Sequence, residues 1–306
     1  MQHTLKAPVE FHGVGLHSGA AAHMVLRPAP IGTGIRFRRT DILLGNATIP
    51  ALWDRVERSP LCTRLLNEAG VSVSTVEHVM AALVGCGVNN AVIDIDGPEV
   101  PILDGSSAPF VRGIMERGVQ AQAAPVVALQ ILKPVTVEKD GARATLLPSE
   151  NFEIEFHIDF EDAAIGRQSK VLDMRNGAFA RELCDSRTFC RQADVDAMHE
   201  HGLALGGTLE NAVVVDGDEV LSPGGFRHVD EAVRHKMLDA LGDLALAGGP
   251  ILGRYVGERA GHSLTNTLLR ELFATPGAVR MVVCDGQEAE RLPGQGLVWA
   301  EIPQVA

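Results

Sequence analysis

The chain has 306 residues, of which 46% are hydrophobic, so it is long enough to bury a sizeable core and to divide into two domains. Its formal net charge of -12 argues against a general nucleic-acid binder, because a phosphate backbone requires a basic protein surface. Any nucleotide that the protein binds should therefore be small.

The cysteines and the amino terminus suggest a reducing compartment. The five cysteines are odd in number and form no CxxC pair, so the sequence indicates neither a disulfide framework nor a thiolate zinc site. Residues 1–6 show no basic segment leading into an apolar one, and no apolar run approaches about 18 residues. We therefore expect a cytoplasmic protein with no export signal and no membrane span.

A helix is predicted to begin near Ser74. Ser74 and Glu77 have the spacing of a capping box, and apolar residues then recur on one stripe as far as Val84. His78 lies opposite that stripe, so it should point to solvent or into a site. Taken alone, the motif also fits a Glu77 that only caps the helix and a His78 that is exposed to solvent.

Runs rich in Val, Ile and Phe predict strands at 91–95, 126–132 and 152–160. In the third run, polar residues alternate with apolar ones, which is the pattern of a strand with one wet face and favours antiparallel pairing. Together with the helical patterns, these strands place the chain in the α+β or α/β class.

A second helix is predicted from about residue 231 to residue 247, with Asp230 as its cap and residues 248–250 as its end. Apolar residues cover most of its circumference, which implies burial. One polar stripe interrupts this surface and consists of His235, Lys236, Asp239 and Asp243. Buried charges need partners, so this stripe should face something polar.

The spacing of His235 and Asp239 is suited to a metal ion, because residues four apart project from one face of a helix. Alone, this motif also fits an intrahelical hydrogen bond or an ion pair with an arginine. With His78 it offers two imidazoles and one carboxylate, which leave an open coordination position, as in catalytic zinc sites. Zinc lowers the pKa of a water bound there to about 7, and Glu77 is the adjacent base for its proton.

His262 precedes a further helical stretch that begins after Gly261. It is either a capping or surface residue, or a general acid that a carboxylate such as Asp243 keeps protonated.

Two sequence parallels suggest an internal duplication. Gly19-Ala20 and Gly141-Ala142 both lead to a Leu-x-Pro strand, and His78 and His235 are both followed by Met two residues later and by Gly seven residues later. We therefore expect a domain at 1–124 that supplies Glu77 and His78 and a domain at 125–306 that supplies the other site residues. A pocket between them would follow, because pockets commonly form at domain interfaces.

Four segments carry a resemblance to a known family: 75–78 (TVEH), 186–189 (SRTF), 235–243 (HKMLDALGD) and 261–264 (GHSL). They resemble the bacterial UDP-3-O-acyl-N-acetylglucosamine deacetylases, and further matches at 12–19, 101–106 and 202–207 extend the likeness over essentially the whole chain. The resemblance implies a zinc hydrolase that removes the N-acetyl group of UDP-3-O-(3-hydroxyacyl)-N-acetylglucosamine and releases acetate, the committed step of lipid A biosynthesis. It also implies two similar α+β domains, each a sheet with two helices, whose helical layers face each other across the active site.

The same resemblance implies a role for each matching residue. The zinc ligands would be His78, His235 and Asp239, with Fe²⁺ as the alternative ion. The catalytic groups would be Glu77 as base, His262 as proton donor, Asp243 orienting His262, and Thr188 stabilising the oxyanion. The substrate contacts would be Lys236 to a phosphate, Asp159 and Phe160 to the uridine, and Arg259 near the diphosphate.

Three further features follow from the likeness. Residues 201–221 resemble an insert that forms an apolar passage for the acyl chain, with a plain buried hairpin as the alternative. Cys190 stands where the family suggests glycine, and its thiol is either a bystander or a place for oxidation. Cys62 matches a family cysteine near the metal and receives no role. A monomer is expected.

Two other functions remain open. A mononuclear Fe(II) oxygenase also uses two histidines and one carboxylate. A catalytically silent protein that binds a sugar nucleotide or an acyl chain would keep the same fold. Acetate release without oxygen would exclude the first, and tight substrate binding without turnover would indicate the second.

Overall fold

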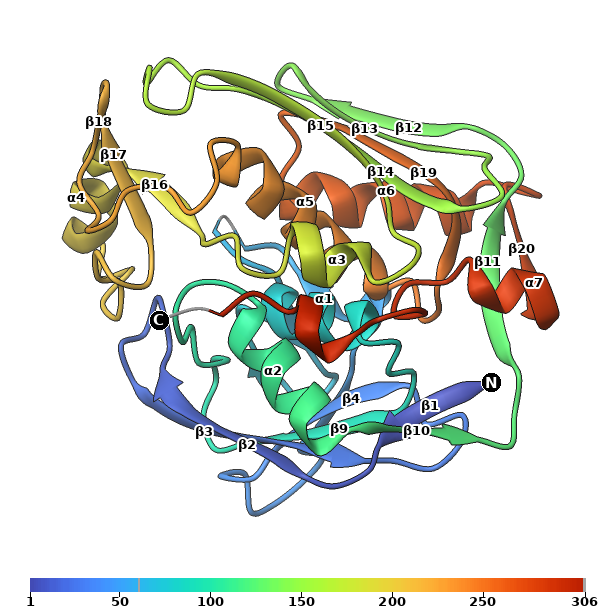
Figure 1. Ribbon diagram of the computed structural model, residues 1–306. Helices are drawn as coiled ribbons and strands as arrows, with labels where there is room; N and C mark the ends of the chain where they lie inside the picture. Colours follow the sequence, from blue (N-terminus) through green and yellow to red (C-terminus); the bar gives the residue numbers. More distant parts are fainter. Residues whose placement is uncertain (60, 305–306) are drawn as a thin grey trace.

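The computed structural model describes residues 1–59 and 61–304 and arranges them in layers (Figure 1). A β-sheet lies on each outer side, and helices of both halves fill the space between the two sheets. This arrangement confirms the predicted α+β class with two sheet-and-helix halves whose helical layers face each other.

The first half contains a five-stranded sheet in the order β2-β3-β9-β4-β5. Its strands are β2 (Val9–Val14), β3 (Ala21–Pro28), β4 (Ile35–Arg39), β5 (Thr48–Pro50) and β9 (Ala91–Ile95). Its helices are α1 (Glu77–Gly85) and α2 (Ala108–Arg117). Phe110 of α2 packs edge-on against Phe11 of β2, with ring centroids 5.0 Å apart, which anchors the helix to the sheet.

The second half contains a seven-stranded sheet in the order β12-β13-β19-β11-β20, in which β14 pairs with β19 and with β15. Its strands are β11 (Val126–Ile131), β12 (Val135–Lys139), β13 (Ala142–Leu147), β14 (Phe152–Asp159), β15 (Arg167–Asp173), β19 (Ile251–Glu258) and β20 (Val279–Cys284). Helix α5 (Glu231–Ala245) packs on β14 and β15, and α6 (His262–Ala274) packs on β12 and β13.

The smaller elements connect and flank these halves. They are β1 (Gln2–Leu5) paired with β10 (Val119–Gln122), β6 (Val56–Glu57), β7 (Arg64–Leu66), β8 (Ser72–Val73), β16 (Phe189–Arg191), β17 (Val213–Asp216), β18 (Glu219–Val220), α3 (Ala178–Glu182), α4 (Gln192–Glu200), α7 (Gly286–Glu290) and the 3-10 turns η1 (Trp53–Arg55) and η2 (Trp299–Glu301). The expected boundary at residues 124–125 falls in the connection between β10 and β11. No described helix combines the length and the apolar composition that a membrane-spanning segment requires.

Helices α1 and α5 make the closest contact between the two halves. After its first two residues, Glu77 and His78, helix α1 carries only apolar residues and glycine, and Val79, Ala81 and Leu83 are fully covered. A Cβ atom on Gly242 of α5 would lie 2.0 Å from the carbonyl oxygen of Glu77 at the start of α1. Glycine at this position therefore lets the two helix backbones approach closely, and it brings the first turn of α1 against the middle of α5.

The strand predictions hold, with one correction to the pairing. Strand β9 has the predicted bounds, β11 ends one residue early, and β14 buries its apolar residues Phe152, Ile154, Phe156 and Ile158 as the alternation predicts. The expected antiparallel pairing is only half right, because β14 runs antiparallel to β15 but parallel to β19.

The predicted helix caps are wrong. Helix α1 begins at Glu77 with no side-chain cap, and Ser74 instead forms a β-bridge with Glu99. The Glu77 carboxylate does not turn back on its own helix, because it accepts the backbone N–H of Thr63 at 3.1 Å. At α5, Asp230 forms no cap hydrogen bond, because its carboxylate binds Arg234 and Lys170 instead.

Candidate metal centre

The first turn of α1 is held by contacts that fix Glu77 and His78. Thr75, two residues before Glu77, has φ of +58°, an unusual conformation for a β-branched residue. Its hydroxyl donates to the buried carboxylate of Glu99 at 3.0 Å, which holds this strained residue in place. On the helix itself, the carbonyl of His78 accepts the hydroxyl of Ser107 at 2.8 Å.

Helix α5 presents His235 and Asp239 to the same point. His235 is 3% exposed, and its Nδ1 lies 3.0 Å from the carbonyl oxygen of Ser186. A carbonyl only accepts, so Nδ1 carries the proton and the Nε2 lone pair is free. That Nε2 lies 3.3 Å from Oδ1 of Asp239, and Nε2 of His78 lies 3.6 Å from the same oxygen.

These three side chains fit a divalent metal ion. Their ligand atoms all lie within 4.8 Å of one another and all three residues are buried. Zinc–ligand bonds of about 2.0–2.1 Å in a tetrahedron place neighbouring ligand atoms about 3.3 Å apart, close to the two distances measured here. Oδ1 of Asp239 is buried and has no hydrogen-bond partner, although most buried polar atoms have one.

The protonation states suit the same ion. Burial lowers the pKa of His235 to about 4, so its imidazole is neutral at pH 7. Burial alone would raise the pKa of Asp239, but His235, Lys236 and His78 outweigh it and hold that pKa well below the usual range. A neutral imidazole and an ionised carboxylate are the forms that bind metals.

A carboxylate–imidazole pair lies beside this centre. Nδ1 of His262, the first residue of α6, lies 2.9 Å from Oδ2 of Asp243, and its Nε2 lies 3.7 Å from Oε1 of Glu77. Burial lowers the pKa of His262, but the carboxylates of Asp243 and Glu77 outweigh burial and raise it to about 9. Burial raises the pKa of Glu77. A carboxylate, Glu77, and a protonated imidazole, His262, thus lie side by side.

A cavity of about 850 Å³ opens from the centre. His235, Asp239 and His262 line it together with many residues from the region after β16. Its apolar lining includes Val195, Met198, Leu203, Leu209 and Ala212. The segment at 201–221 therefore contributes residues to a cavity and includes the paired strands β17 and β18.

Among the predicted substrate contacts, three residues line this cavity and one does not. Phe160, Lys236 and Arg259 line it, and Phe160 packs edge-on against Phe189 with centroids 5.4 Å apart. Thr188, the predicted oxyanion donor, also lines it. Asp159 lies outside the lining, and its carboxylate pairs with Arg167 at 3.0 Å.

The two cysteines noted in the sequence are poor nucleophiles. Cys190 lines the cavity, and burial raises the pKa of its thiol to about 11. Cys62 is buried, and burial followed by the charge of Glu77 raises its pKa to about 11 as well. Both are therefore protonated thiols at pH 7, which argues against an easily oxidised thiolate.

Three residues near the centre were not predicted. Glu99 is 4% exposed and accepts the backbone N–H groups of His17 and Ser18 at 2.8 Å each, besides the hydroxyl of Thr75. His17 lines the cavity, and neither of its buried ring nitrogens has a partner. Thr63 donates its hydroxyl to Asp243. His17 stands in a segment that carried the resemblance, whereas Glu99 and Thr63 had no local signal.

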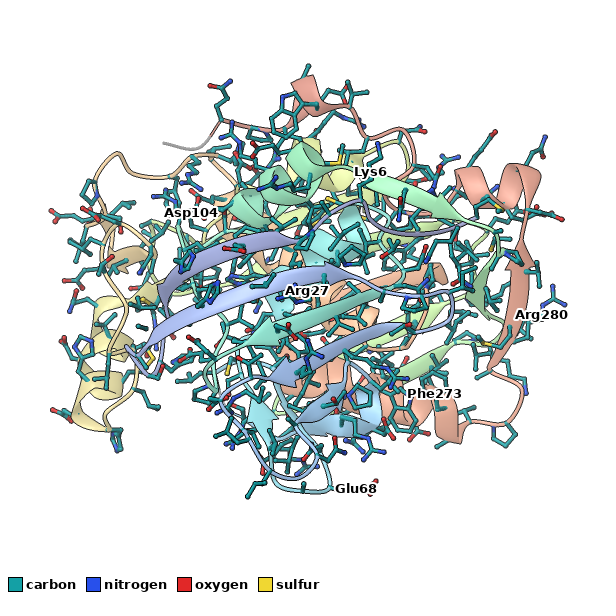
Figure 2. All side chains as sticks on the ribbon, turned by 90° about the horizontal axis from the view of Figure 1, so that it is seen from below. Lys6, Arg27, Glu68, Asp104, Phe273 and Arg280 are labelled. Atoms are coloured by element: carbon teal, nitrogen blue, oxygen red, sulfur yellow. The ribbon has the colours of Figure 1, made fainter. Side chains whose placement is uncertain are left out.

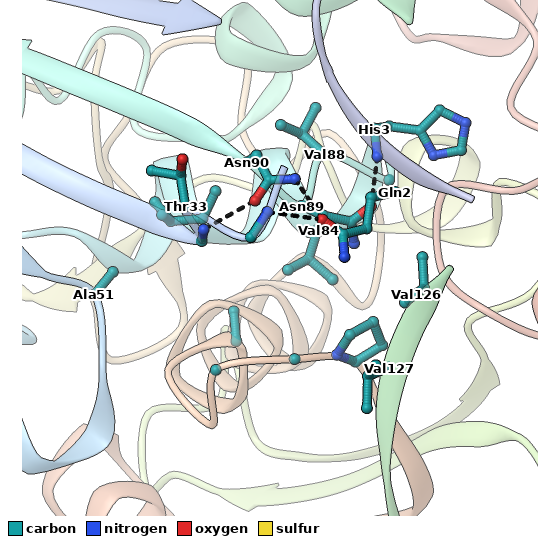
Figure 3. A pocket seen from close by; sticks show the side chains of 18 of the residues that line it. Gln2, His3, Thr33, Ala51, Val84, Val88, Asn89, Asn90, Val126 and Val127 are labelled. Atoms are coloured by element: carbon teal, nitrogen blue, oxygen red, sulfur yellow. Dashed lines mark hydrogen bonds between the residues drawn. The ribbon is translucent and has the colours of Figure 1, made fainter. Parts of the chain in front are cut away.

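A second, smaller cavity of about 270 Å³ lies at the other ends of α1 and α5 (Figure 3). It is bordered by Val84 and Val88 from one half and by Val126 and Val127 from the other. The Asn90 side chain closes one side, accepting the N–H of Gly34 and donating to Gln2. Its lining also includes His3 and Arg36, but none of the acid–base and metal-binding side chains of the centre.

Comparison with known proteins gives consistent matches. The family model described as UDP-3-O-acyl N-acetylglycosamine deacetylase matches residues 2–274. The UDP-3-O-acyl-N-acetylglucosamine deacetylase of Phenylobacterium zucineum (strain HLK1) is 50% identical over 280 residues, which cover 92% of this chain and 96% of that protein. The proteins of the same name from Shewanella frigidimarina (strain NCIMB 400) and Shewanella pealeana (strain ATCC 700345 / ANG-SQ1) are each 44% identical, over 93% and 92% of both chains, respectively.

Proposed function

Because this chain belongs to the family of UDP-3-O-acyl N-acetylglycosamine deacetylases, we propose that it hydrolyses the N-acetyl group of UDP-3-O-(3-hydroxyacyl)-N-acetylglucosamine in lipid A biosynthesis and releases acetate. The observation that carries this proposal is the meeting of His78, His235 and Asp239 from two helices beside Glu77 and His262. Metal ligands, a base and an acid at one end of a cavity are the parts that amide hydrolysis requires.

His78, His235 and Asp239 would hold a zinc ion, with Fe²⁺ as the alternative that the same ligands accept. The unpartnered Oδ1 of Asp239 supports this assignment, because it lies between the two imidazole nitrogens without a hydrogen bond of its own. When bound, the ion supplies Lewis-acid polarisation of the amide carbonyl and lowers the pKa of water to about 7.

Glu77 is the base that takes a proton from the attacking water. Burial raises its pKa, which makes the carboxylate a better proton acceptor than an exposed glutamate. His262 then donates a proton from Nε2 to the departing amine nitrogen. The Asp243 carboxylate accepts a hydrogen bond from Nδ1–H of His262. This bond keeps Nε2 directed at Glu77 and at Asp239.

Thr188 and Lys236 would stabilise charge on the substrate. The Thr188 hydroxyl is the proposed donor to the oxyanion, as a preorganised group in a partly dry site. Burial lowers the pKa of Lys236, but Asp239 outweighs it, so the ammonium stays charged. It already donates to Oδ2 of Asp239 at 2.9 Å, and its remaining hydrogens are proposed to bind a substrate phosphate.

The substrate would extend along the cavity lined by the 201–221 segment. A volume of about 850 Å³ with an apolar lining suits one acyl chain, since ligand pockets commonly measure about 300–1,000 Å³. Phe160 and Arg259, which line it, are the proposed contacts to the uridine and the diphosphate. Asp159 is kept as a proposed uridine contact, for which substrate would have to compete with Arg167.

The first test is acetate release from this substrate by the purified chain, before chelation, after chelation, and after zinc is restored. We expect turnover that chelation removes and zinc restores, both in air and without oxygen. UDP-N-acetylglucosamine, which lacks the acyl chain, is the matched control and should react far more slowly. A folded, zinc-loaded protein that binds the acylated substrate without releasing acetate would contradict the proposal and indicate a binding protein.

A further inference from the structure

The outer face of the first sheet carries a second group of metal-binding side chains, which the proposed function does not use. Glu10, His12 and His23 place a carboxylate oxygen and two imidazole nitrogens within 4.8 Å of one another. The proposed metal ligands and acid–base residues instead stand on α1, α5 and α6, which lie between the two sheets (Figure 1). The group therefore needs its own explanation.

Strand geometry brings the three residues together. Glu10 and His12 are two residues apart on β2, so they point to the same face, whereas the alternating residues Val9 and Phe11 are buried in the core. His12 lies directly opposite His23 in the antiparallel register of β2 and β3. His23 also shares a face with Arg27, four residues along β3, which Figure 2 shows on the outer surface of the sheet.

The contacts of these side chains leave imidazole nitrogens and the Glu10 carboxylate available to a metal ion. The His12 and His23 rings stack with centroids 4.3 Å apart and an angle of 2° between their planes. Nε2 of His23 is shielded from solvent, has no hydrogen-bond partner, and lies 3.9 Å from Oε2 of Glu10. Within the described parts of the chain, that histidine is the one ion-pair contact of Glu10.

The surrounding charges do not oppose a cation. Arg27 and Arg38 both bind the carboxylate of Asp94, at 2.6 Å each, so their charges are directed elsewhere on the face. The carboxylate of Asp96 accepts the backbone N–H of His23 at 2.8 Å, which places one more negative charge close to the pair.

We propose that Glu10, His12 and His23 bind one divalent transition-metal ion, such as Cu²⁺, Ni²⁺ or Zn²⁺. Two imidazoles select these ions over Mg²⁺ and Ca²⁺, which prefer oxygen ligands. A tetrahedral zinc site requires nitrogen atoms about 3.3 Å apart, so the stacked rings have to turn about their side-chain bonds to direct both lone pairs at one ion. His12 is exposed, and the side chain of His23 is 41% exposed.

The test is a metal titration of the full chain that has first been saturated with one equivalent of zinc. Cu²⁺ is then added, and its spectrum by electron paramagnetic resonance reports how many imidazole nitrogens bind it. We expect one additional ion with two coupled nitrogens. Supporting residues around metal ligands typically contribute about 10–100-fold to affinity, so His12→Asn and His23→Asn should each weaken this ion by at least about tenfold.

His157→Asn is the matched control, because His157 lies on β14 of the other sheet and its two ring nitrogens already contact Ser169 and Glu155. It should bind the additional ion as the unaltered chain does. Circular dichroism checks that the two ligand variants and the control variant are folded. Binding of no additional ion, a spectrum with a single coupled nitrogen, or an affinity in His12→Asn and His23→Asn equal to that of the unaltered chain would overturn the proposal. None of these outcomes depends on acetate release, so the result is separate from that of the proposed function.

Discussion

Two groups of side chains in this molecule have the same composition, two histidines and one carboxylate, but different surroundings. His78, His235 and Asp239 are 3–5% exposed and come from two helices that belong to different halves of the chain. Of the second group, the side chains of His23 and Glu10 are 41% and 63% exposed, and all three residues stand on one pair of neighbouring strands. The donor atoms alone therefore do not distinguish a reaction centre from a surface site.

Burial makes the difference. In the buried group, the Ser186 carbonyl selects the tautomer of His235, and neighbouring charges keep Asp239 ionised. The acid–base pair of Glu77 and His262 stands beside it and a cavity leads to it. Within residues 1–59 and 61–304, the exposed group has no acid–base pair of this kind beside it, so the proposed role of this group is to bind an ion rather than to direct chemistry at a substrate.

Removing the buried carboxylate should have the largest effect on metal affinity and activity. Asp239→Ala should lose metal affinity and activity together, because two imidazoles from separate helices then hold the ion alone. We expect turnover to fall by more than the about 10²–10⁴-fold that loss of a general base costs. Metal content after dialysis and acetate release measure both effects. The exposed carboxylate variant Glu68→Ala is the control, and full zinc occupancy in Asp239→Ala would remove this residue from the ligands.

A second prediction separates chemistry from metal binding within the buried group. Glu77→Gln keeps the shape of the side chain but cannot accept a proton, so turnover should fall by about 10²–10⁴-fold while zinc stays bound. Zinc content and single-turnover rates are measured on the same sample. Near-normal turnover would show that another group is the base.

A third prediction concerns the pH profile, which the exposed group should not affect. Activity requires ionised Glu77 and protonated His262, so it should rise with pH as Glu77 ionises and fall again as His262 loses its proton, near its pKa of about 9. The Asp243 carboxylate raises the pKa of His262, so Asp243→Asn should lower that pKa and move the alkaline limb to lower pH. An alkaline limb that stays in place in the variant, in profiles of kcat/KM, would contradict the assignment of His262.

The smallest effect on turnover is expected from changing Glu99, which holds Thr75 next to the buried group. Glu99→Gln replaces an acceptor of three hydrogen bonds by a group with one accepting oxygen, so one N–H or hydroxyl loses its partner. This should lower the free energy of unfolding by about 1–3 kcal/mol, with a smaller loss of turnover than in the other variants. Urea denaturation measures the first effect. Unchanged stability would show that Thr75 is held by its backbone neighbours alone.

Periodicity and spacing predicted the elements but not what holds them in position. The polar stripe on α5 and the alternation in β14 are local patterns, and both are reproduced in the structure. The family resemblance supplied the identities of the residues that meet at the centre. The strained Thr75 and its partner Glu99 could not be predicted, because that contact joins residues 24 positions apart in the chain through tertiary packing.

The predictions of the helix caps at α1 and α5 are wrong for a related reason. The spacing of Ser74 and Glu77 fits a capping box. The Glu77 carboxylate nevertheless accepts the N–H of Thr63 and forms no cap on its own helix. Asp230 similarly binds Arg234 and Lys170. Polar residues at a helix start are thus ambiguous when a functional site lies beside it.

The division of the buried ligands between α1 and α5 has a consequence for biosynthesis. During translation, His78 leaves the ribosome long before His235 and Asp239 have been made, so the nascent first half offers a single imidazole from this centre. Under the proposed ligand assignment, all three ligands would reach an ion only after α5 has been synthesised and has docked against α1 at Gly242. Metal uptake would then be a late event that marks a chain made and folded through both halves.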